Sequence, residues 1–382
     1  MTRYWSIDDH FSSADGAGIQ AADFHGRYRE LFEDSVRRQL MSDVPLGIFL
    51  SGGVDSALIT AAAAAQETGL HCFTVNEEAT RMSGDLDQAR RVAGHFGNPL
   101  HILDLDQDEV LGNPEFDLAE LERMVWTMDS PRFSLEIYFK YRLHRFVKSR
   151  FPEIKVVLIG QGADEFCGGY TNEHGDSFSD WPEYVENAAL PILAAFDDLK
   201  KNARWPIPEA AFDVATDSQR PVFHRIMQMH VTSLQFYNLW HEDRTSSAHG
   251  IEARVPFLDH RLVELAASVP PALHSELFWD KQIVRAMIPE LLPAYPADRP
   301  KVPFIDVPGN RSIRHVYAGI LNRVFPDFQQ QYPYFSPGTP LGEQARILRS
   351  QATAGNAGWY TQARKLLHIM CTAIFERRCQ QA

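Results

Sequence analysis

The most distinctive chemical feature of the sequence is a short segment of small and acidic residues that follows an apolar stretch. It consists of Ser51, Gly52, Gly53, Val54, Asp55 and Ser56. Glycines let the backbone approach a ligand closely, consecutive N–H groups bind anions, and the N-terminus of a following helix adds positive potential. An acidic residue beside an anion is explained when a divalent cation bridges the two. The segment therefore predicts a phosphate-binding loop with Asp55 as a Mg²⁺ ligand, although a turn that caps a helix has the same composition.

This loop is not a Walker A loop, because its spacing is shorter and no Lys-Ser/Thr pair follows. A second Gly-rich segment, LIGQGADEFCGGY at residues 158–170, also follows an apolar run. Its acidic residues Asp164 and Glu165 could complete a magnesium site with Asp55. Taken alone, the segment is equally consistent with a flexible acidic turn.

A third segment, HGIEARVPFLDHRLVELAASVPPAL at residues 249–273, is rich in charged residues. Glu252 is a candidate catalytic residue here. Glu252, Arg254 and Asp259 could also form a buried ion-pair network that positions loops, and the sequence does not distinguish the two roles.

The elements around these segments alternate between strand and helix. Short apolar runs typical of buried strands occur at residues 46–50, 70–75, 100–105 and 155–160. Helical patterns lie between them, including an alanine-rich stretch directly after the first loop. This alternation predicts an α/β fold with a parallel sheet covered on both faces, whose ligands bind at the carboxyl ends of the strands.

The second half of the chain loses this alternation. Segments with helical periodicity cover residues 183–202, 221–241, 281–292 and 356–379, which predicts a largely helical C-terminal half. The first 20 residues are polar and typical of an arm or linker, and a helix is expected from Phe24. The expected organisation is an N-terminal arm, residues 1–27, and a catalytic domain, residues 28–382, divided into a nucleotide-binding half, 28–175, and a helical half, 176–382.

Composition excludes several classes of function. The 382 residues carry a net charge of −13, which disfavours binding to nucleic acids and to anionic membranes. The four cysteines form no CxxC pair, so neither a disulfide framework nor a zinc site is expected. The N-terminus has no signal-peptide pattern and no run of about 18 apolar residues occurs, so a cytoplasmic location is expected.

Three long motifs resemble segments of the asparagine synthetase family and occur in that family's order: VPLGIFLSGGVDS, GQGADEFCGGY and HGIEARVPFLDHRLVE. The similarity extends from about residue 28 to residue 305. It implies a fold of the adenine-nucleotide alpha-hydrolase type, also called the PP-loop ATP pyrophosphatase type. It also implies an enzyme that adenylates a carboxylate with ATP and Mg²⁺, releases pyrophosphate, and forms an amide when an amine or ammonia displaces AMP.

The resemblance also assigns roles to individual residues. Residues 51–56 match the pyrophosphate loop, and Asp55 and Asp164 match the family's magnesium-binding aspartates. Leu50, Val75 and Gly160 match positions that border the nucleotide.

Two lysines also match the family. Lys281, in WDKQIVRAM, is similar to the catalytic lysine, whose charge would stabilise the transition states. Lys301, in RPKVPF, resembles a lysine near the polyphosphate. For each lysine, a solvated surface charge is the alternative.

The N-terminus departs from the family pattern. Asparagine synthetases carry a glutaminase domain whose nucleophile is a cysteine at position 2, whereas Thr2 stands here. The segment around Tyr4 and Trp5 resembles the one that follows that domain, so glutamine hydrolysis is not expected. A threonine nucleophile is the alternative. The expected partners are a small-molecule carboxylate, an amine or ammonia, and a separate glutaminase or a carrier protein.

The second departure is Gln161, where asparagine synthetases usually have a glutamate between two glycines. An amide cannot act as a general base near neutral pH, so a catalytic step is altered at this position. Ser130 likewise replaces a usual glutamate. Asparagine synthesis is the leading interpretation. The alternatives are a tailoring amide ligase or cyclase similar to β-lactam-forming ligases, a tRNA-modifying enzyme with a PP-loop, and a non-catalytic nucleotide-binding protein.

Overall fold

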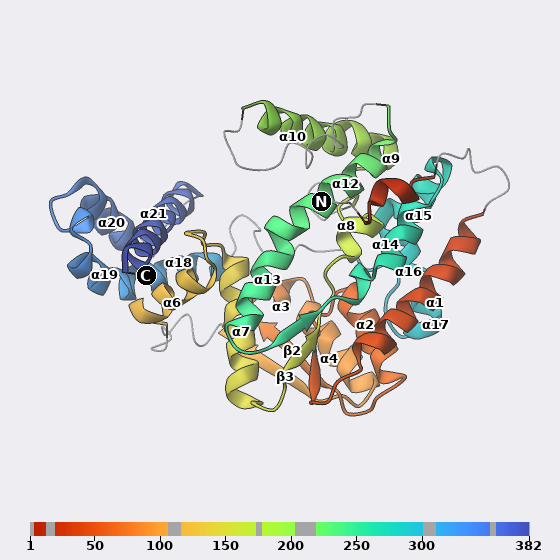
Figure 1. Cartoon of the computed structure of the whole chain (residues 1–382). Coiled ribbons are helices and arrows are strands. Elements are labelled where there is room, and N and C mark those ends of the chain that lie inside the picture. Colours follow the sequence, from red (N-terminus) through yellow and green to blue (C-terminus); the bar gives the residue numbers. More distant parts are fainter. Residues whose placement is uncertain are drawn as a thin grey trace.

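The computed structural model describes residues 4–12, 20–105, 116–172, 178–202, 219–300, 311–351 and 357–381. Its centre is a five-stranded sheet of the order β3-β2-β1-β4-β5, in which every neighbouring pair is parallel (Figure 1). The strands are β1 (Leu46–Phe49), β2 (His71–Asn76), β3 (Leu100–Asp104), β4 (Val156–Leu158) and β5 (Glu252–Arg254). The predicted α/β fold with a parallel sheet is confirmed.

Helices of the first half of the chain connect and cover these strands. They are α1 (Ala21–Gln39), α2 (Val54–Ala64), α3 (Glu78–Met82), α4 (Asp85–His95), α6 (Leu118–Thr127), α7 (Leu135–Arg150) and α8 (Ala163–Cys167). The expected helix from Phe24 is α1, which begins three residues earlier and buries Phe24, Tyr28, Phe32 and Val36 along one face.

Among the described residues of the second half, β5 is the only strand and the other regular elements are helices. It contains α9 (Trp181–Tyr184), α10 (Leu190–Asn202), α12 (Val222–Phe236), α13 (Asn238–Ser247), α14 (His260–Ala267), α15 (His274–Phe278), α16 (Gln282–Arg285) and α17 (Ile288–Leu291). It ends with α18 (Arg311–Arg323), α19 (Phe325–Gln331), α20 (Pro340–Ser350) and α21 (Ala357–Gln381), which group beside α6 at one end of the molecule (Figure 1). The segment with helical periodicity over 221–241 forms the two helices α12 and α13, which are divided at Tyr237, whose φ of −136° and ψ of −81° are not helical.

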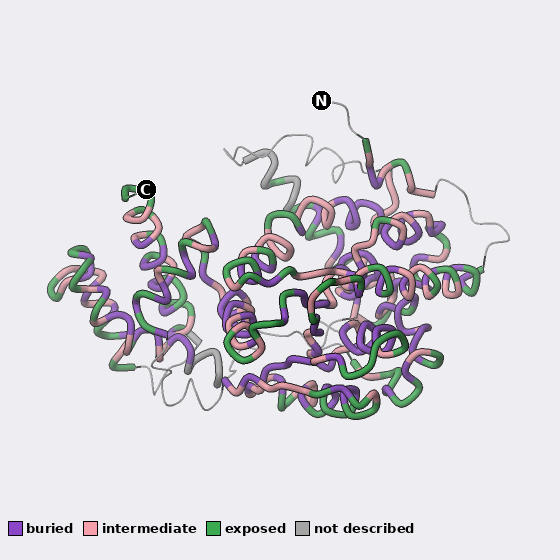
Figure 2. Tube along the Cα trace, turned by 60° about the horizontal axis from the view of Figure 1, so that its bottom comes forward, coloured by how far each residue is buried: buried purple, intermediate pink, exposed green. Residues whose placement is uncertain are grey.

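Two apolar cores lie on opposite faces of the sheet, because successive strand residues point to opposite sides. Ile48 and Leu158 belong to the core that includes α1 and α2, whereas Phe73 and Val157 belong to the core that includes α7 and the C-terminal helices. The buried segments in Figure 2 accordingly run through the middle of the molecule. This arrangement confirms that both faces of the sheet are covered.

The described part of the N-terminal arm differs from the expected linker. Ile7–His10 form a 3₁₀ helix that contacts α14, and the Ile7 side chain is 3% exposed within the first core. Trp5 Nε1 donates a hydrogen bond of 2.8 Å to Glu264. The side chains of Trp5 and Ile7 therefore pack against the protein, although the residues beside them in the sequence are polar. None of the helices described by the structure is long and apolar enough to cross a membrane.

Candidate active site

The first Gly-rich segment forms the predicted turn between β1 and α2. Gly53 precedes the first residue of α2, and its N–H donates to Ser51 Oγ at 3.2 Å. The hydroxyls of Ser51 and Ser56 lie 3.0 Å apart. Together they present hydroxyl groups at the N-terminus of an 11-residue helix, where partial positive charge favours an anion.

Gly52 explains why the turn requires glycine. Its φ is +98°, and a Cβ placed on it would lie 2.0 Å from the carbonyl oxygen of Asp85. Its own carbonyl oxygen accepts hydrogen bonds from the Tyr295 hydroxyl at 3.0 Å and from Arg299 Nη1 at 3.1 Å. The second half of the chain therefore holds this loop in place.

The second Gly-rich segment lies directly against the first. A Cβ placed on Gly160, just after β4, would lie 3.1 Å from the Cβ of Asp55. Asp164, in the first turn of α8, contributes a second carboxylate. The carboxyl ends of the adjacent strands β1 and β4 thus bring together the two aspartates that were predicted to bind magnesium.

Lys281 lies between these aspartates. Its Nζ is 2.7 Å from Asp55 Oδ2 and 2.5 Å from Asp164 Oδ1, and its side chain is 1% exposed. Burial would lower the pKa of this lysine, but the two carboxylates outweigh that effect and raise it. Asp280 and Lys281 have φ values of 47° and 55°, so two successive left-handed residues direct the lysine inward.

A cavity of about 560 Å³ opens beside this cluster. One end is lined by the residues that follow β1, β2 and β4, among them Ser51, Asp55, Ser56, Thr74, Val75 and Gly160. The size is that of a small-molecule site, and its position at the carboxyl ends of parallel strands is where ligands of α/β proteins bind.

The other end of the cavity is polar and charged. Gln161 and Glu165 line it together with Glu136, Lys140, His230, Tyr237, Asn238 and Glu242, whereas Asp164 lines the cavity beside Asp55. Burial raises the pKa of Glu165, and the neighbouring Asp164 raises it further. Burial lowers the pKa of His230 to about 4, so that its ring is neutral at pH 7. This half of the cavity combines carboxylates, an ammonium group and neutral polar groups.

The family model of asparagine synthase matches residues 27–337. The chain belongs to the asparagine synthase family. The matched region contains both Gly-rich loops, Lys281 and all five strands.

Individual asparagine synthetases show the same relationship. The glutamine-hydrolysing asparagine synthetase 2 of Bacillus subtilis is 36% identical over 314 residues, which cover 79% of this chain and 41% of the relative. The glutamine-hydrolysing asparagine synthetase of Homo sapiens is 26% identical over 365 residues, which cover 90% of this chain and 55% of the relative. The glutamine-hydrolysing asparagine synthetase of Rattus norvegicus is 26% identical, and the match covers 93% of this chain and 60% of the relative. The chain thus spans about half the length of the curated relatives it matches.

Among the described residues assigned from the family resemblance, Leu50, Gly52, Gly53 and Lys281 do not line the cavity. Leu50 is fully buried, and its N–H donates to the carbonyl oxygen of Phe73 at 2.9 Å, as an interior sheet residue would. Lys301 lies outside the described residues, as does Thr2.

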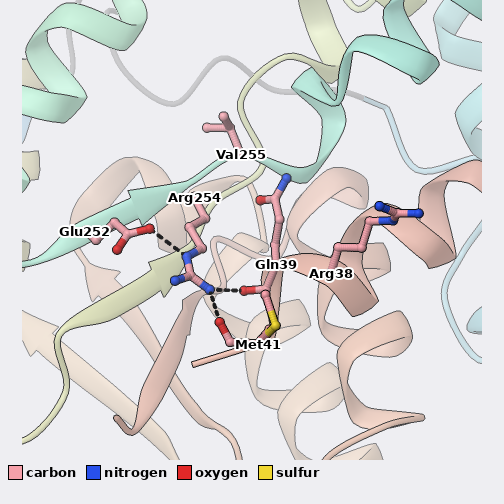
Figure 3. A pocket seen from close by; sticks show the side chains of 6 residues that line it. All are labelled: Arg38, Gln39, Met41, Glu252, Arg254 and Val255. Atoms are coloured by element: carbon pink, nitrogen blue, oxygen red, sulfur yellow. Dashed lines mark hydrogen bonds and ion pairs between the residues drawn. The ribbon is translucent and has the colours of Figure 1, made fainter. Parts of the chain in front are cut away.

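Glu252, which the sequence suggested as a catalytic residue, does not line the cavity. It begins β5, at the amino end of the sheet, whereas the two loops follow the carboxyl ends of the strands. Its side chain is 61% exposed and accepts a hydrogen bond of 2.8 Å from Arg254, whose guanidinium also donates to the carbonyl oxygens of Gln39 and Met41 (Figure 3). The position is away from the cavity, and the contacts are those of the alternative role, an ion-pair network that positions a loop.

The charged end of the cavity was not predicted from the sequence. Glu136, Lys140 and His144 follow one another at intervals of four residues on α7, a spacing that places them on one helical face. That pattern was visible in the sequence. Glu242 was not identifiable in the same way, because only the fold brings α13 against α7.

One observation indicates that the site is suited to a magnesium ion. Asp55 and Asp164 already converge on a single cation, the ammonium group of Lys281. Mg²⁺ commonly uses one or two carboxylates together with the phosphates of its substrate. No cluster of three or more His, Cys, Asp or Glu residues suited to a metal occurs among the described residues.

Proposed function

We propose that this chain forms an amide bond at the expense of ATP, which is converted to AMP and pyrophosphate through adenylation of a carboxylate. The observation that carries the proposal is the convergence of Asp55, Asp164 and Lys281 beside the Ser-Gly-Gly loop, at one end of a cavity with a charged far end. Membership of the asparagine synthase family supports the same chemistry.

In this proposal, the nucleotide binds at the end of the cavity formed by residues 28–175. The backbone N–H groups of the first loop and the hydroxyls of Ser51 and Ser56 would bind phosphate oxygens. Val75 and Gly160 would border the nucleoside, and they line the cavity. Leu50 would contribute only through packing beneath the loop, since its N–H is already bonded within the sheet.

Asp55 and Asp164 would hold the magnesium ion that accompanies ATP. When bound, the ion would neutralise charge on the pyrophosphate leaving group. Lys281, from the 176–382 half of the chain, is the buried cation beside both carboxylates. It would stabilise the negative charge that develops on phosphate oxygens during adenylation and on the acyl oxygen during amide formation.

The first substrates to test are aspartate and ammonia, because the relatives found are named asparagine synthetases. The protein would be incubated with ATP, MgCl₂, aspartate and ammonium chloride, and then with other carboxylates and amines. AMP and pyrophosphate should appear in equal amounts, only in the presence of a carboxylate. Release of ADP and phosphate would contradict adenylation, and no turnover with any pair in the panel would contradict the proposed reaction. Asp55→Asn should lower pyrophosphate release by at least about 100-fold.

A further inference from the structure

Gln161 makes a contact that links the second loop to α13. Its Nε2 lies 3.5 Å from Oε2 of Glu242, and both side chains line the cavity. The other amide atom of Gln161, Oε1, is buried and has no hydrogen-bond partner among the described residues. A buried acceptor without a partner has a free-energy cost that a bound N–H donor would remove. The pair is therefore suited to a ligand that carries N–H groups.

Glu242 is held as an anion. Its side chain is buried, with Oε1 2.8 Å from His144 Nε2 and Oε2 3.0 Å from Lys140 Nζ. Burial would raise the pKa of this carboxyl, but the charge of Lys140 and the hydrogen bond from His144 lower it to about 2. An ionised carboxylate thus stands beside an amide that cannot accept a proton itself.

The surrounding charges favour a cation. Lys140 Nζ also lies 3.3 Å from Glu136 Oε1, so this single ammonium group faces two carboxylates. Burial would raise the pKa of Glu136, yet a hydrogen bond from His241 and the charge of Lys140 lower it overall. Burial and the nearby Lys140 lower the pKa of His241. Two ionised carboxylates and one ammonium group therefore face this end of the cavity.

We propose that Glu242, together with Gln161, binds the incoming amine and stabilises the positive charge that its nitrogen acquires during attack. The inference rests on the proposed amide-forming function and specifies its nitrogen site. The amine nitrogen forms a bond to the acyl carbon, the bond from that carbon to the AMP oxygen breaks, and AMP leaves with the electron pair. One proton leaves the nitrogen for solvent, and the Glu242 carboxylate stays ionised. Gln161 Oε1 accepts a second N–H and orients the nucleophile.

A purely structural role is the competing explanation, since Glu242 also ties α13 to α7 through His144 and Lys140. The two roles differ in which half-reaction they affect. Loss of an amine site impairs amide formation but leaves adenylation, which needs no amine. Loss of a structural tie impairs both half-reactions and lowers thermal stability.

The experiment measures both half-reactions on the full chain. Carboxylate-dependent ATP–pyrophosphate exchange reports adenylation, with aspartate as the first probe, and amide formation is measured with ammonium chloride. Glu242→Gln should lower amide formation about 100-fold, while exchange changes less than about threefold. The matched control is Glu120→Gln, which alters a carboxylate that is also buried and paired, with Arg145 at 2.9 Å, but does not line the cavity. It should leave the ratio of the two rates unchanged.

A double variant exchanges the carboxylate and the amide between positions 242 and 161, whose side chains are in contact. The double variant Glu242→Gln with Gln161→Glu should form the amide at least about tenfold faster than Glu242→Gln alone. If Glu242→Gln does not fold, Gln161→Met must show the same separation of the two half-reactions. Unchanged amide formation in Glu242→Gln, or an equal loss of both half-reactions, would overturn the inference. Absence of exchange in the wild-type protein with every carboxylate tested would instead contradict the proposed function.

Discussion

The ammonium nitrogen of Lys281 lies 2.7 Å from a carboxylate oxygen of Asp55, although the two residues are 226 positions apart in the chain. The contact joins the first turn of α2 to the helical half of the protein. Arg299 and Tyr295 bind the same loop through the carbonyl oxygen of Gly52. The phosphate loop is thus supported by residues far beyond the strand and helix that form it, so its conformation depends on the docking of the second half.

Replacement of Lys281 by methionine should leave Asp55 and Asp164 as neighbouring carboxylates without their common cation. Removing one partner from a buried ion pair typically costs about 3 to 5 kcal/mol. The melting temperature of Lys281→Met should therefore fall, and MgCl₂ should raise it more than in the wild-type protein, because a divalent cation would replace the lost charge. Thermal unfolding at constant ionic strength, with and without Mg²⁺, tests this. The exposed Lys365→Met is the control, and an equal effect of Mg²⁺ on both variants would contradict the prediction.

The sequence was most informative where local rules determine structure. The loop at residues 51–56 was predictable because glycines, serines and an aspartate directly follow a buried strand and precede a helix. The convergence of Asp55 and Asp164 followed from the geometry of parallel strands, whose carboxyl ends share one edge. Lys281 was predictable only by resemblance, because nothing local distinguishes a buried lysine from an exposed one.

The incorrect and missing predictions share one physical cause. Glu252 stands in a segment rich in charged residues, but β5 is only three residues long, and Glu252 occupies the end opposite the loops. Glu242 acquires its surroundings from the packing of α13 on α7, which the local sequence does not encode. Strand direction and helix docking therefore decided which charged residues reached the cavity.

Gly52→Ala should destabilise the protein and impair nucleotide binding. The substitution places a Cβ 2.0 Å from the Asp85 carbonyl oxygen at a φ of +98°, so the loop must move. The backbone conformation alone costs about 1 to 3 kcal/mol, and the KM for ATP should rise as the N–H groups are displaced. Gly94→Ala in α4 is the control, since a Cβ there meets nothing within 4 Å. It should be neutral or stabilising by about 0.5 to 1 kcal/mol. Equal stability of the two variants in urea unfolding would refute this account of the loop.

Arg299→Lys should weaken ATP binding although the charge is retained. The guanidinium of Arg299 donates to the carbonyl oxygens of Gly52 at 3.1 Å and Ser83 at 3.0 Å and also contacts Asp85. One ammonium group cannot reproduce this planar arrangement. Loss of about 1 to 2 kcal/mol predicts a KM for ATP about 5- to 30-fold higher. Arg346→Lys, at an exposed pair with Glu343, should leave the KM unchanged. An unaltered KM in Arg299→Lys would mean that the loop holds its conformation without this contact.

The stability of the protein should decrease with acidification below about pH 6.5 through its buried histidines. His274 is 3% exposed, and its Nε2 donates to the Val269 carbonyl oxygen at 3.0 Å. Burial, together with the neighbouring His224, lowers the pKa of His274 to about 3. Histidine in an unfolded chain has a pKa of about 6.5, so between about pH 6.5 and pH 3 the unfolded state binds a proton that the folded state does not. The free energy of unfolding must therefore fall as the pH falls across this range.

A variant at His274 tests this pH dependence directly. His274→Gln keeps a neutral N–H donor for Val269 and removes the titration, so its free energy of unfolding should fall less steeply below pH 6.5 than that of the wild-type protein, although it starts lower at pH 7.5. Urea unfolding at pH 7.5, 6.5, 5.5 and 4.5 measures the difference. His260→Gln, at a side chain 69% exposed, should follow the wild-type curve. Parallel curves for His274→Gln and the wild-type protein would show that His274 does not resist protonation in the folded state, and the assigned direction of its pKa would be wrong.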